Sequence, residues 1–257
     1  MEYQNLDFWT DADVGYVALD RPNHRNALSF DLLEELVAVA REISSSDLRT
    51  VVVTGNGTDF CAGFDVSGFE VGLLQESTPV QRYEAAQLGG VMADAIESLP
   101  QITVAALHGN VIGGGVVLTA ACDLRVADAD TVFSIPEVDL GIPLAWGGIE
   151  RLVREFGSAI TKELVLTCRP FTAQEGKAAG FLNAITQPGG SMDIAKELAV
   201  HIAERPRLPT VTTKRHVAEV LRGDFSRDDA MGLITALDDD ESTAARNAYL
   251  ARFRTTT

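Results

Sequence analysis

The chain is poor in positive charge and in long apolar runs, and each shortage excludes a class of protein. Its 257 residues include 21 Lys and Arg against 37 Asp and Glu, which gives a net charge of −16. Such a total repels nucleic acid, and no local basic patch offsets it, so we predict no nucleic-acid partner. No stretch reaches the roughly 18 uninterrupted apolar residues of a membrane span, and no secretory signal is recognisable. We therefore expect neither membrane insertion nor secretion.

Cysteine is also scarce. Only Cys61, Cys122 and Cys168 are present, and they lie far apart. An odd, widely spaced set forms neither a disulfide framework nor a metal-ligand pattern. These cysteines therefore predict a reducing, cytoplasmic location and no metal site.

What the sequence does contain is a regular alternation of strand and helix patterns up to about residue 190. Short runs of apolar residues next to glycine turns are typical of strands buried on both faces. Apolar residues that recur every three or four positions indicate helices between them. We expect strands at 14–20, 50–54, 103–107, 124–127 and 131–134, and helices at 30–43, 82–99, 116–122 and from 148 onward. This alternation predicts an α/β fold.

Beyond residue 173 the pattern becomes mainly helical. Four successive helices are predicted at 174–179, 192–203, 210–221 and 228–252, with a break at Pro206–Pro209. The sequence thus predicts an α/β core at 1–190 and a helical C-terminal region at 191–257.

A glycine triplet, Gly113-Gly114-Gly115, opens the apolar helix near residue 116. Glycine lets bare backbone approach a ligand, and the first N–H groups of a helix have no acceptor within it. Such N–H groups stabilise negative charge on a ligand. By itself, however, a triplet indicates no more than a tight packing turn.

Six short motifs occur in the order and spacing of the crotonase (enoyl-CoA hydratase/isomerase) family, and together they cover nearly the whole chain. Each is weak alone, but six in order are specific. They are LDRPNHRNAL at 19–28, FCAGFD at 60–65, GNVIGGG at 109–115, CDLRVA at 122–127, FSIPEVDLG at 133–141 and GGIERL at 147–152. The chain therefore resembles that family. The resemblance implies a spiral of ββα turns, a helical C-terminal region that packs subunits together, and a homotrimer or a hexamer of two trimers.

The resemblance also implies an acyl-coenzyme A thioester as substrate. Backbone N–H groups of Phe64 and Gly114 would form an oxyanion hole for the thioester oxygen, and Glu137 would be the catalytic carboxylate. Pro136 and the apolar loop after Glu137 further predict a raised pKa for this carboxyl. No cofactor is expected, because coenzyme A is part of the substrate.

Seven residues are expected to contact the substrate. Ala62 would face the adenine or the pantetheine arm through its backbone, and Arg25 would meet the phosphates. Tyr249 and Arg252 would reach the adenine and phosphate, in part across a subunit contact. Trp146 stands where the family has a small residue, and it either lines or shortens the acyl pocket or fills core space. The full set is Arg25, Ala62, Asp65, Gly113, Trp146, Tyr249 and Arg252; residues 66–90 are expected to shape the acyl pocket.

One family feature is missing. Hydratases of this family carry a second glutamate just after the glycine triplet, and here that position is Val117. A valine can neither activate water nor move a proton, so the resemblance favours an isomerase that converts 3-enoyl-CoA to 2-enoyl-CoA with Glu137 alone. Asp139 and Glu150 are nearby acids, but their family counterparts are not catalytic. A hydratase that uses Glu137 alone and a non-catalytic acyl-CoA-binding protein stay open as alternatives.

Overall fold

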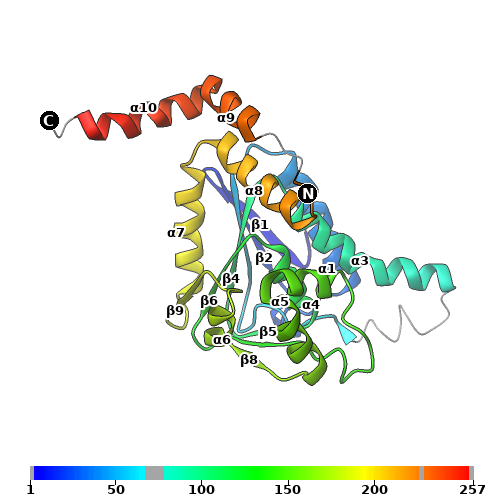
Figure 1. Cartoon of the computed structure of the whole chain (residues 1–257). Helices are drawn as coiled ribbons and strands as arrows, with labels where there is room; N and C mark the ends of the chain where they lie inside the picture. Colours follow the sequence, from blue (N-terminus) through cyan, green and yellow to red (C-terminus); the bar gives the residue numbers. More distant parts are fainter. Residues whose placement is uncertain (1–2, 67–77, 226–228, 255–257) are drawn as a thin grey trace.

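The computed structural model describes residues 3–66, 78–225 and 229–254, and Figure 1 shows a mixed α/β body from which two helices project. Six strands form the main sheet in the order β1-β2-β3-β4-β6-β9. β1 is antiparallel to β2, and all other neighbours are parallel. These strands are β1 (Leu6–Asp11), β2 (Val14–Leu19), β3 (Thr50–Gly55), β4 (Ile102–Leu107), β6 (Leu124–Asp128) and β9 (Ala184–Thr186).

The central strands are apolar on both faces because helices cover both faces of the sheet. On one face Val52 and Val104 pack against the small residues Ala195 and Ala199 of α7 (Ser191–Ala203). The alternate residues of the same strands belong to the larger core, which is covered by α1 (Phe30–Ser44), α3 (Pro79–Glu97) and α4 (Gly114–Ala121). The runs that predicted buried strands are therefore apolar at every position because a layer of helices covers each face of the sheet.

A smaller sheet of three strands in the order β5-β7-β8 lies beside the main one. It consists of β5 (Asn110–Ile112), β7 (Val132–Ser134) and β8 (Phe171–Thr172), and α5 (Gly148–Thr167) and α6 (Ala173–Ala178) flank it in sequence. Its core is aromatic: Phe133 stacks on Phe171 with ring centroids 5.0 Å apart, and Phe156 stacks on Phe181 at 4.6 Å. This packing fixes the ends of β5 and β7, which carry the residues of the site.

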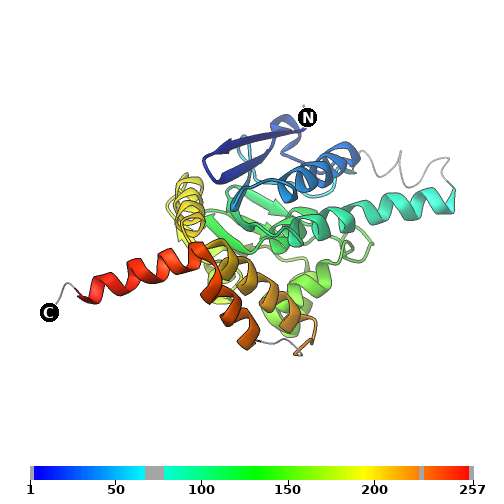
Figure 2. The same cartoon turned by 90° about the horizontal axis from the view of Figure 1, so that it is seen from above.

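The C-terminal part contains α8 (Arg207–Leu221), α9 (Asp229–Asp238) and α10 (Asp240–Arg254). The predicted single helix at 228–252 is wrong, because the chain breaks at Asp239, whose carboxylate accepts a hydrogen bond from Ser242 N at 2.8 Å. The proximity of Ser242 lowers the pKa of Asp239. Figure 2 shows α10 leading away from the body on the side opposite to the projecting end of α3.

The other helices and strands expected up to residue 221 are present, with ends within three residues of the prediction. α8 starts at Arg207, directly after Pro206, and Pro209 lies in its first turn, where a missing N–H costs nothing. No helix among the described residues is both long and apolar enough to cross a membrane. The division at residue 190 stays a prediction, and α7, although beyond it, packs against the main sheet.

Candidate active site

Two adjoining cavities share Phe64, Glu137 and Ile142, and they bring together most of the residues that sequence predicted for catalysis. The inner cavity has a volume of about 200 Å³ and the outer one about 460 Å³. Of the predicted pocket segment 66–90, positions 67–77 lie outside the described residues, whereas Ala85 and Ala86 line the inner cavity. Its other lining residues are Phe64, Gly114, Val117, Glu137, Ile142, Pro143, Leu144, Ala145 and Trp146. The outer cavity is lined by Ala62, Gly63, Phe64, Val66, Ile112, Gly113, Pro136, Glu137, Leu140 and Ile142.

The two predicted oxyanion loops run side by side, joined by backbone hydrogen bonds. Cys61 N donates to Asn110 O at 3.1 Å, and Ile112 N donates to Cys61 O at 2.9 Å. The first loop (60–65) comes close to the second (109–115) at Gly63. Gly63 has a φ of +87°, and a Cβ at this position would lie 2.8 Å from Ile112 O. Only glycine fits that approach, and it brings the Phe64 backbone next to Gly114.

The side chain of Asp59 stabilises the contact between the two loops. It is nearly buried, and it accepts hydrogen bonds from Asn110 N at 3.0 Å and from Arg25 Nε at 2.9 Å. The hydrogen bond from Arg25 is the main cause that holds the pKa of Asp59 far below its usual range. Asp59 is therefore ionised at neutral pH and cross-links the first turn to both loops.

Gly113 and Gly114 connect the second loop to α4, and their conformation places the N-terminus of α4 at the cavities. Gly113 has φ +51° and donates its N–H to Ser134 O at 2.9 Å. A Cβ on Gly113 would overlap Glu137 Oε1, and one on Gly114 would overlap the Trp146 ring. Across the described residues, nothing accepts a hydrogen bond from Gly114 N, as expected at the first position of a helix.

Glu137 supplies the acid of the site. It follows β7 and Pro136, and its carbonyl accepts a hydrogen bond from Ile142 N at 3.0 Å, which fixes the loop. The side chain is half-buried, and within the described part of the chain its Oε2 atom is fully buried without a hydrogen-bond partner. Burial raises the pKa of Glu137 above its ordinary value. A carboxyl with one unpartnered oxygen at the edge of an apolar cavity can exchange a proton with a bound molecule.

No second acid accompanies Glu137 in the described lining of either cavity. Val117 is fully buried and lines the inner cavity, where it packs close to Gly148 of α5. Asp139 and Glu150 are exposed and line neither cavity, in agreement with their expected role as surface charges. Among the described residues that line the inner cavity, Glu137 carries the one ionisable side chain.

Four of the predicted substrate contacts line neither cavity. Arg25 is bound to Asp59, although its backbone O accepts a hydrogen bond from Ala62 N at 2.9 Å and so borders the outer cavity. Asp65 forms an ion pair with Arg21 at 3.0 Å, which fixes the end of the first oxyanion loop. Tyr249 and Arg252 lie on α10, which projects away from the body (Figure 1). Within one chain they do not reach the cavities.

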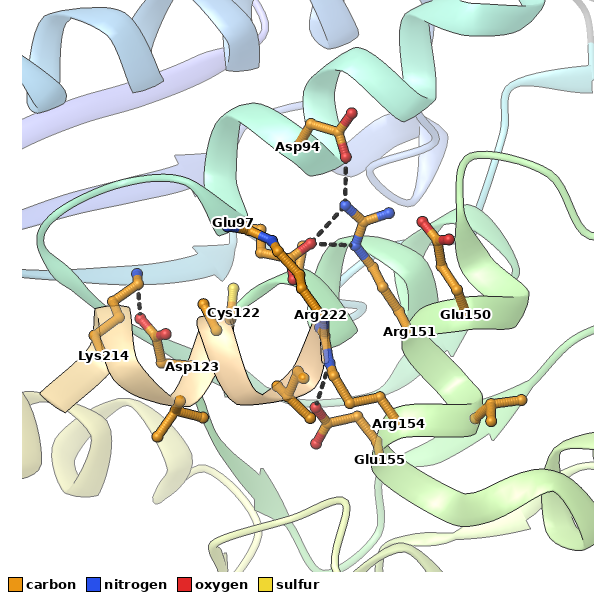
Figure 3. Close-up of a pocket in the computed structure, with 15 residues that line it drawn as sticks. Asp94, Glu97, Cys122, Asp123, Glu150, Arg151, Arg154, Glu155, Lys214 and Arg222 are labelled. Carbon is orange, nitrogen blue, oxygen red and sulfur yellow. Dashed lines mark hydrogen bonds and ion pairs between the residues drawn. The ribbon is translucent and has the colours of Figure 1, made fainter. Parts of the chain in front are cut away.

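A larger cavity, of about 720 Å³, lies between α3, α5 and α8 (Figure 3) and shares no lining residue with the two at Glu137. Its charged groups largely pair with one another. Arg151 bonds to Asp94 and Glu97 at 2.6 Å each, and Lys214 bonds to Asp123 at 2.7 Å. The first pairs join α5 to α3, and the last joins α8 to the turn between α4 and β6, so we assign them a structural role.

Sequence reasoning missed one residue that supports the site. Arg151 is 2% exposed, and besides its ion pairs it donates a hydrogen bond from Nη1 to Trp146 O at 3.0 Å. It therefore ties the loop that closes the inner cavity to α3. A lone arginine in an amphipathic helix carries no sequence signal for such a role.

The parallel sheet, the two hydrogen-bonded loops and a half-buried glutamate at their cavities agree with a protein of crotonase type. Residues 10–234 match the sequence profile of the family described as enoyl-CoA hydratase/isomerase. The chain belongs to the enoyl-CoA hydratase/isomerase family, whose members are enzymes that act on acyl-CoA thioesters.

Its relatives include both kinds of enzyme. The chain is 31% identical over 227 residues to a short-chain-enoyl-CoA hydratase of Clostridium acetobutylicum, covering 88% of this chain and 85% of the relative. It is 33% identical over 192 residues to a peroxisomal Δ(3,5)-Δ(2,4)-dienoyl-CoA isomerase of Arabidopsis thaliana, covering 72% and 69%. Among solved structures, it is similar to a putative enoyl-CoA hydratase/isomerase family protein from Hyphomonas neptunium, with a TM-score of 0.90, 27% identity, and 97% and 95% coverage.

Proposed function

We propose that the protein is an enoyl-CoA isomerase that converts 3-enoyl-CoA to 2-enoyl-CoA. One observation carries this proposal: among the described residues that line the two cavities, Glu137 is the single ionisable side chain. A double-bond shift needs one group that removes a proton and returns it elsewhere. The position that would hold a second carboxylate is occupied by Val117.

In the proposed reaction, the ionised Glu137 removes a proton from carbon 2 of the bound thioester. The electrons of that C–H bond form a double bond between carbons 1 and 2, and the π electrons of the carbonyl move onto the thioester oxygen, which gives a dienolate. N–H groups of Phe64 and Gly114 would stabilise this dienolate. The protonated Glu137 then returns the proton to carbon 4, where the electrons of the C3=C4 double bond form the new C–H bond. The electrons of the C1=C2 double bond move between carbons 2 and 3, and the carbonyl reforms. The base, the proton carrier and the oxyanion donors all come from the chain, so the reaction needs no cofactor beyond the coenzyme A of the substrate.

Hydration is the second candidate, and the similarity to the hydratase of Clostridium acetobutylicum favours it. A positioned water needs about two to four polar partners. The described walls of the inner cavity offer one carboxylate, and Val117, Leu144 and Trp146 surround it with apolar surface. This argues against a water held for attack on carbon 3, and it makes proton transfer the better use of Glu137.

Coenzyme A would lie along the outer cavity, where backbone atoms of Ala62 and Gly113 are available. Arg25 borders this side and would meet a phosphate. Assembly into a homotrimer, or a hexamer of two trimers, would bring Tyr249 and Arg252 to the site of another subunit. The exposed apolar side chains of α9 and α10 support such packing: Met231, Leu233, Ile234, Leu237, Leu250 and Phe253. A cytoplasmic location stays a prediction from the cysteines.

Substitution of Glu137→Gln tests the proposal, with Glu150→Gln as the matched control, because Glu150 is exposed and lines neither cavity at Glu137. Loss of the proton carrier should lower the isomerisation rate by about 10²- to 10⁴-fold while acyl-CoA affinity is kept. The control should retain the wild-type rate. A Glu137→Gln protein that isomerises normally would contradict the proposal. A wild-type protein that binds acyl-CoA tightly but transforms no enoyl-CoA would identify a binding protein instead.

A further inference from the structure

Trp146 occupies an unusual place in the inner cavity. It is a non-glycine residue with φ +60°, a conformation that costs about 1–2 kcal/mol for a residue with a Cβ. Its ring lies edge-on to the Phe64 ring, with centroids 5.7 Å apart. The indole therefore contacts the residues of both proposed oxyanion donors, Phe64 and Gly114.

Two helices make room for this indole. A Cβ on Gly114 of α4 would overlap the six-membered part of the ring, and a Cβ on Gly89 of α3 would overlap Cδ2 and Cε2. Both glycines are buried helical positions where alanine would otherwise be preferred. The indole thus fills a slot between α3 and α4 that any other residue at positions 89 or 114 would close.

The backbone of Trp146 is fixed as firmly as its ring. Arg151 donates hydrogen bonds to Trp146 O at 3.0 Å and to Gly147 O at 3.4 Å, and Arg151 is itself held by Asp94 and Glu97. Figure 3 shows the guanidinium of Arg151 directed at the carboxylates of α3. Trp146 is therefore a rigid wall of the inner cavity, because its ring packs against α3 and α4 and its carbonyl is bonded to Arg151 of α5, which is paired with carboxylates of α3.

We infer that Trp146 limits the acyl group to a short chain and is the residue that determines chain-length specificity. This inference rests on the proposed function, since it takes the inner cavity as the acyl site. A cavity of about 200 Å³ equals roughly six or seven volumes of about 30 Å³, the share of one water molecule and about that of a methylene group. With Trp146 in place, the substrates are acyl-CoA thioesters of about four to eight carbons.

The experiment measures binding separately from turnover. The affinities of saturated acyl-CoA thioesters, from butyryl- to hexadecanoyl-CoA, are determined by calorimetry for the wild type and for Trp146→Gly. Glycine suits the positive φ at this position and removes the ring. Trp9→Phe is the matched control, because Trp9 is the other tryptophan of the chain and lies on β1, stacked on Tyr16. In the control protein Trp146 is the sole tryptophan, so its fluorescence reports the inner cavity.

We expect wild type and Trp9→Phe to bind butyryl- and hexanoyl-CoA at least tenfold more tightly than dodecanoyl-CoA, and Trp146→Gly to remove this difference. Short acyl-CoA thioesters should change the Trp146 emission of the control protein, whereas coenzyme A alone should not. Ala85→Leu narrows the same cavity while Trp146 is kept, and it should move the binding preference towards shorter acyl chains. This second variant decides the matter if Trp146→Gly does not fold.

Equal wild-type affinity for butyryl- and hexadecanoyl-CoA, with no change in Trp146→Gly or Ala85→Leu, would overturn the inference. Selective binding of short chains without any isomerisation would uphold it and refute the proposed function. Failure of the wild type to bind any acyl-CoA would refute both.

Discussion

Gly89 and Gly90 are neighbours on α3, yet alanine at these two positions should have opposite effects on stability. In a helix interior, Gly→Ala stabilises by about 0.5–1 kcal/mol when the new methyl group has room. A Cβ at Gly90 meets nothing closer than 3.7 Å, whereas a Cβ at Gly89 would overlap the Trp146 ring. The ring cannot retreat, because Gly114 lies against it and Arg151 holds the carbonyl of the same residue.

Overpacking of this kind costs about 1–3 kcal/mol. Gly90→Ala should therefore raise the free energy of unfolding by about 0.5–1 kcal/mol. Gly89→Ala has the same benefit in helix propensity, but the cost of overpacking against the Trp146 ring exceeds it. We expect Gly89→Ala to be about 1–3 kcal/mol less stable than Gly90→Ala. For a chain of this size the difference corresponds to roughly 2–10 °C in Tm.

Thermal and urea unfolding of the two single variants and the wild type measure this difference directly. Both substitutions add the same methyl group to the same helix, so propensity cancels in the comparison. Equal stability of the two variants would show that the indole does not occupy the slot at Gly89, and the reasoning about the inner cavity would fail with it.

Two further predictions concern the acid of the site. Burial raises the folded-state pKa of Glu137, so the protonated carboxyl favours the folded state; this stabilisation is present at low pH and is lost as pH rises through the raised pKa. Urea unfolding should accordingly find Glu137→Gln as stable as wild type near pH 4 and more stable than wild type at pH 8. A stability difference that does not grow with pH would contradict the burial of this carboxyl. Val117→Glu would place a second carboxyl in the inner cavity. Mass spectrometry should then detect water addition to 2-enoyl-CoA at least about 100-fold faster than in wild type. An unchanged rate of hydration would show that the missing glutamate does not limit hydration.

The apolar strands and the helices of the core could be predicted because each depends on a local pattern. β1 could not be predicted, because it is an edge strand in which only Leu6 is buried, and its alternation of apolar and polar residues ends after Phe8. The break between α9 and α10 was equally hidden, since Asp239 stops the helix through one capping hydrogen bond to Ser242. The sequence also did not predict β5, β8 and β9, because strands of two or three residues are too short to show a period.

The two loops and Glu137 were predictable from the family motifs, whose spacing already encodes which segments meet. The surroundings of Trp146 were not. Its slot depends on Gly89 of α3 and on the tether from Arg151, and these contacts join segments that are far apart in sequence. Sequence alone left open whether Trp146 fills core or lines a pocket, and the structure shows the ring at the wall of the inner cavity.

The most direct test of the central proposal is incubation of the purified protein with 3-enoyl-CoA and 2-enoyl-CoA whose acyl groups have four to eight carbons. Absorbance measures the formation of the conjugated double bond, and mass spectrometry measures the addition of water. A single carboxylate in an apolar cavity predicts conversion of 3-enoyl-CoA to 2-enoyl-CoA without a gain of mass. Rapid hydration of 2-enoyl-CoA without isomerisation would contradict it, and would show that Glu137 activates water despite Val117.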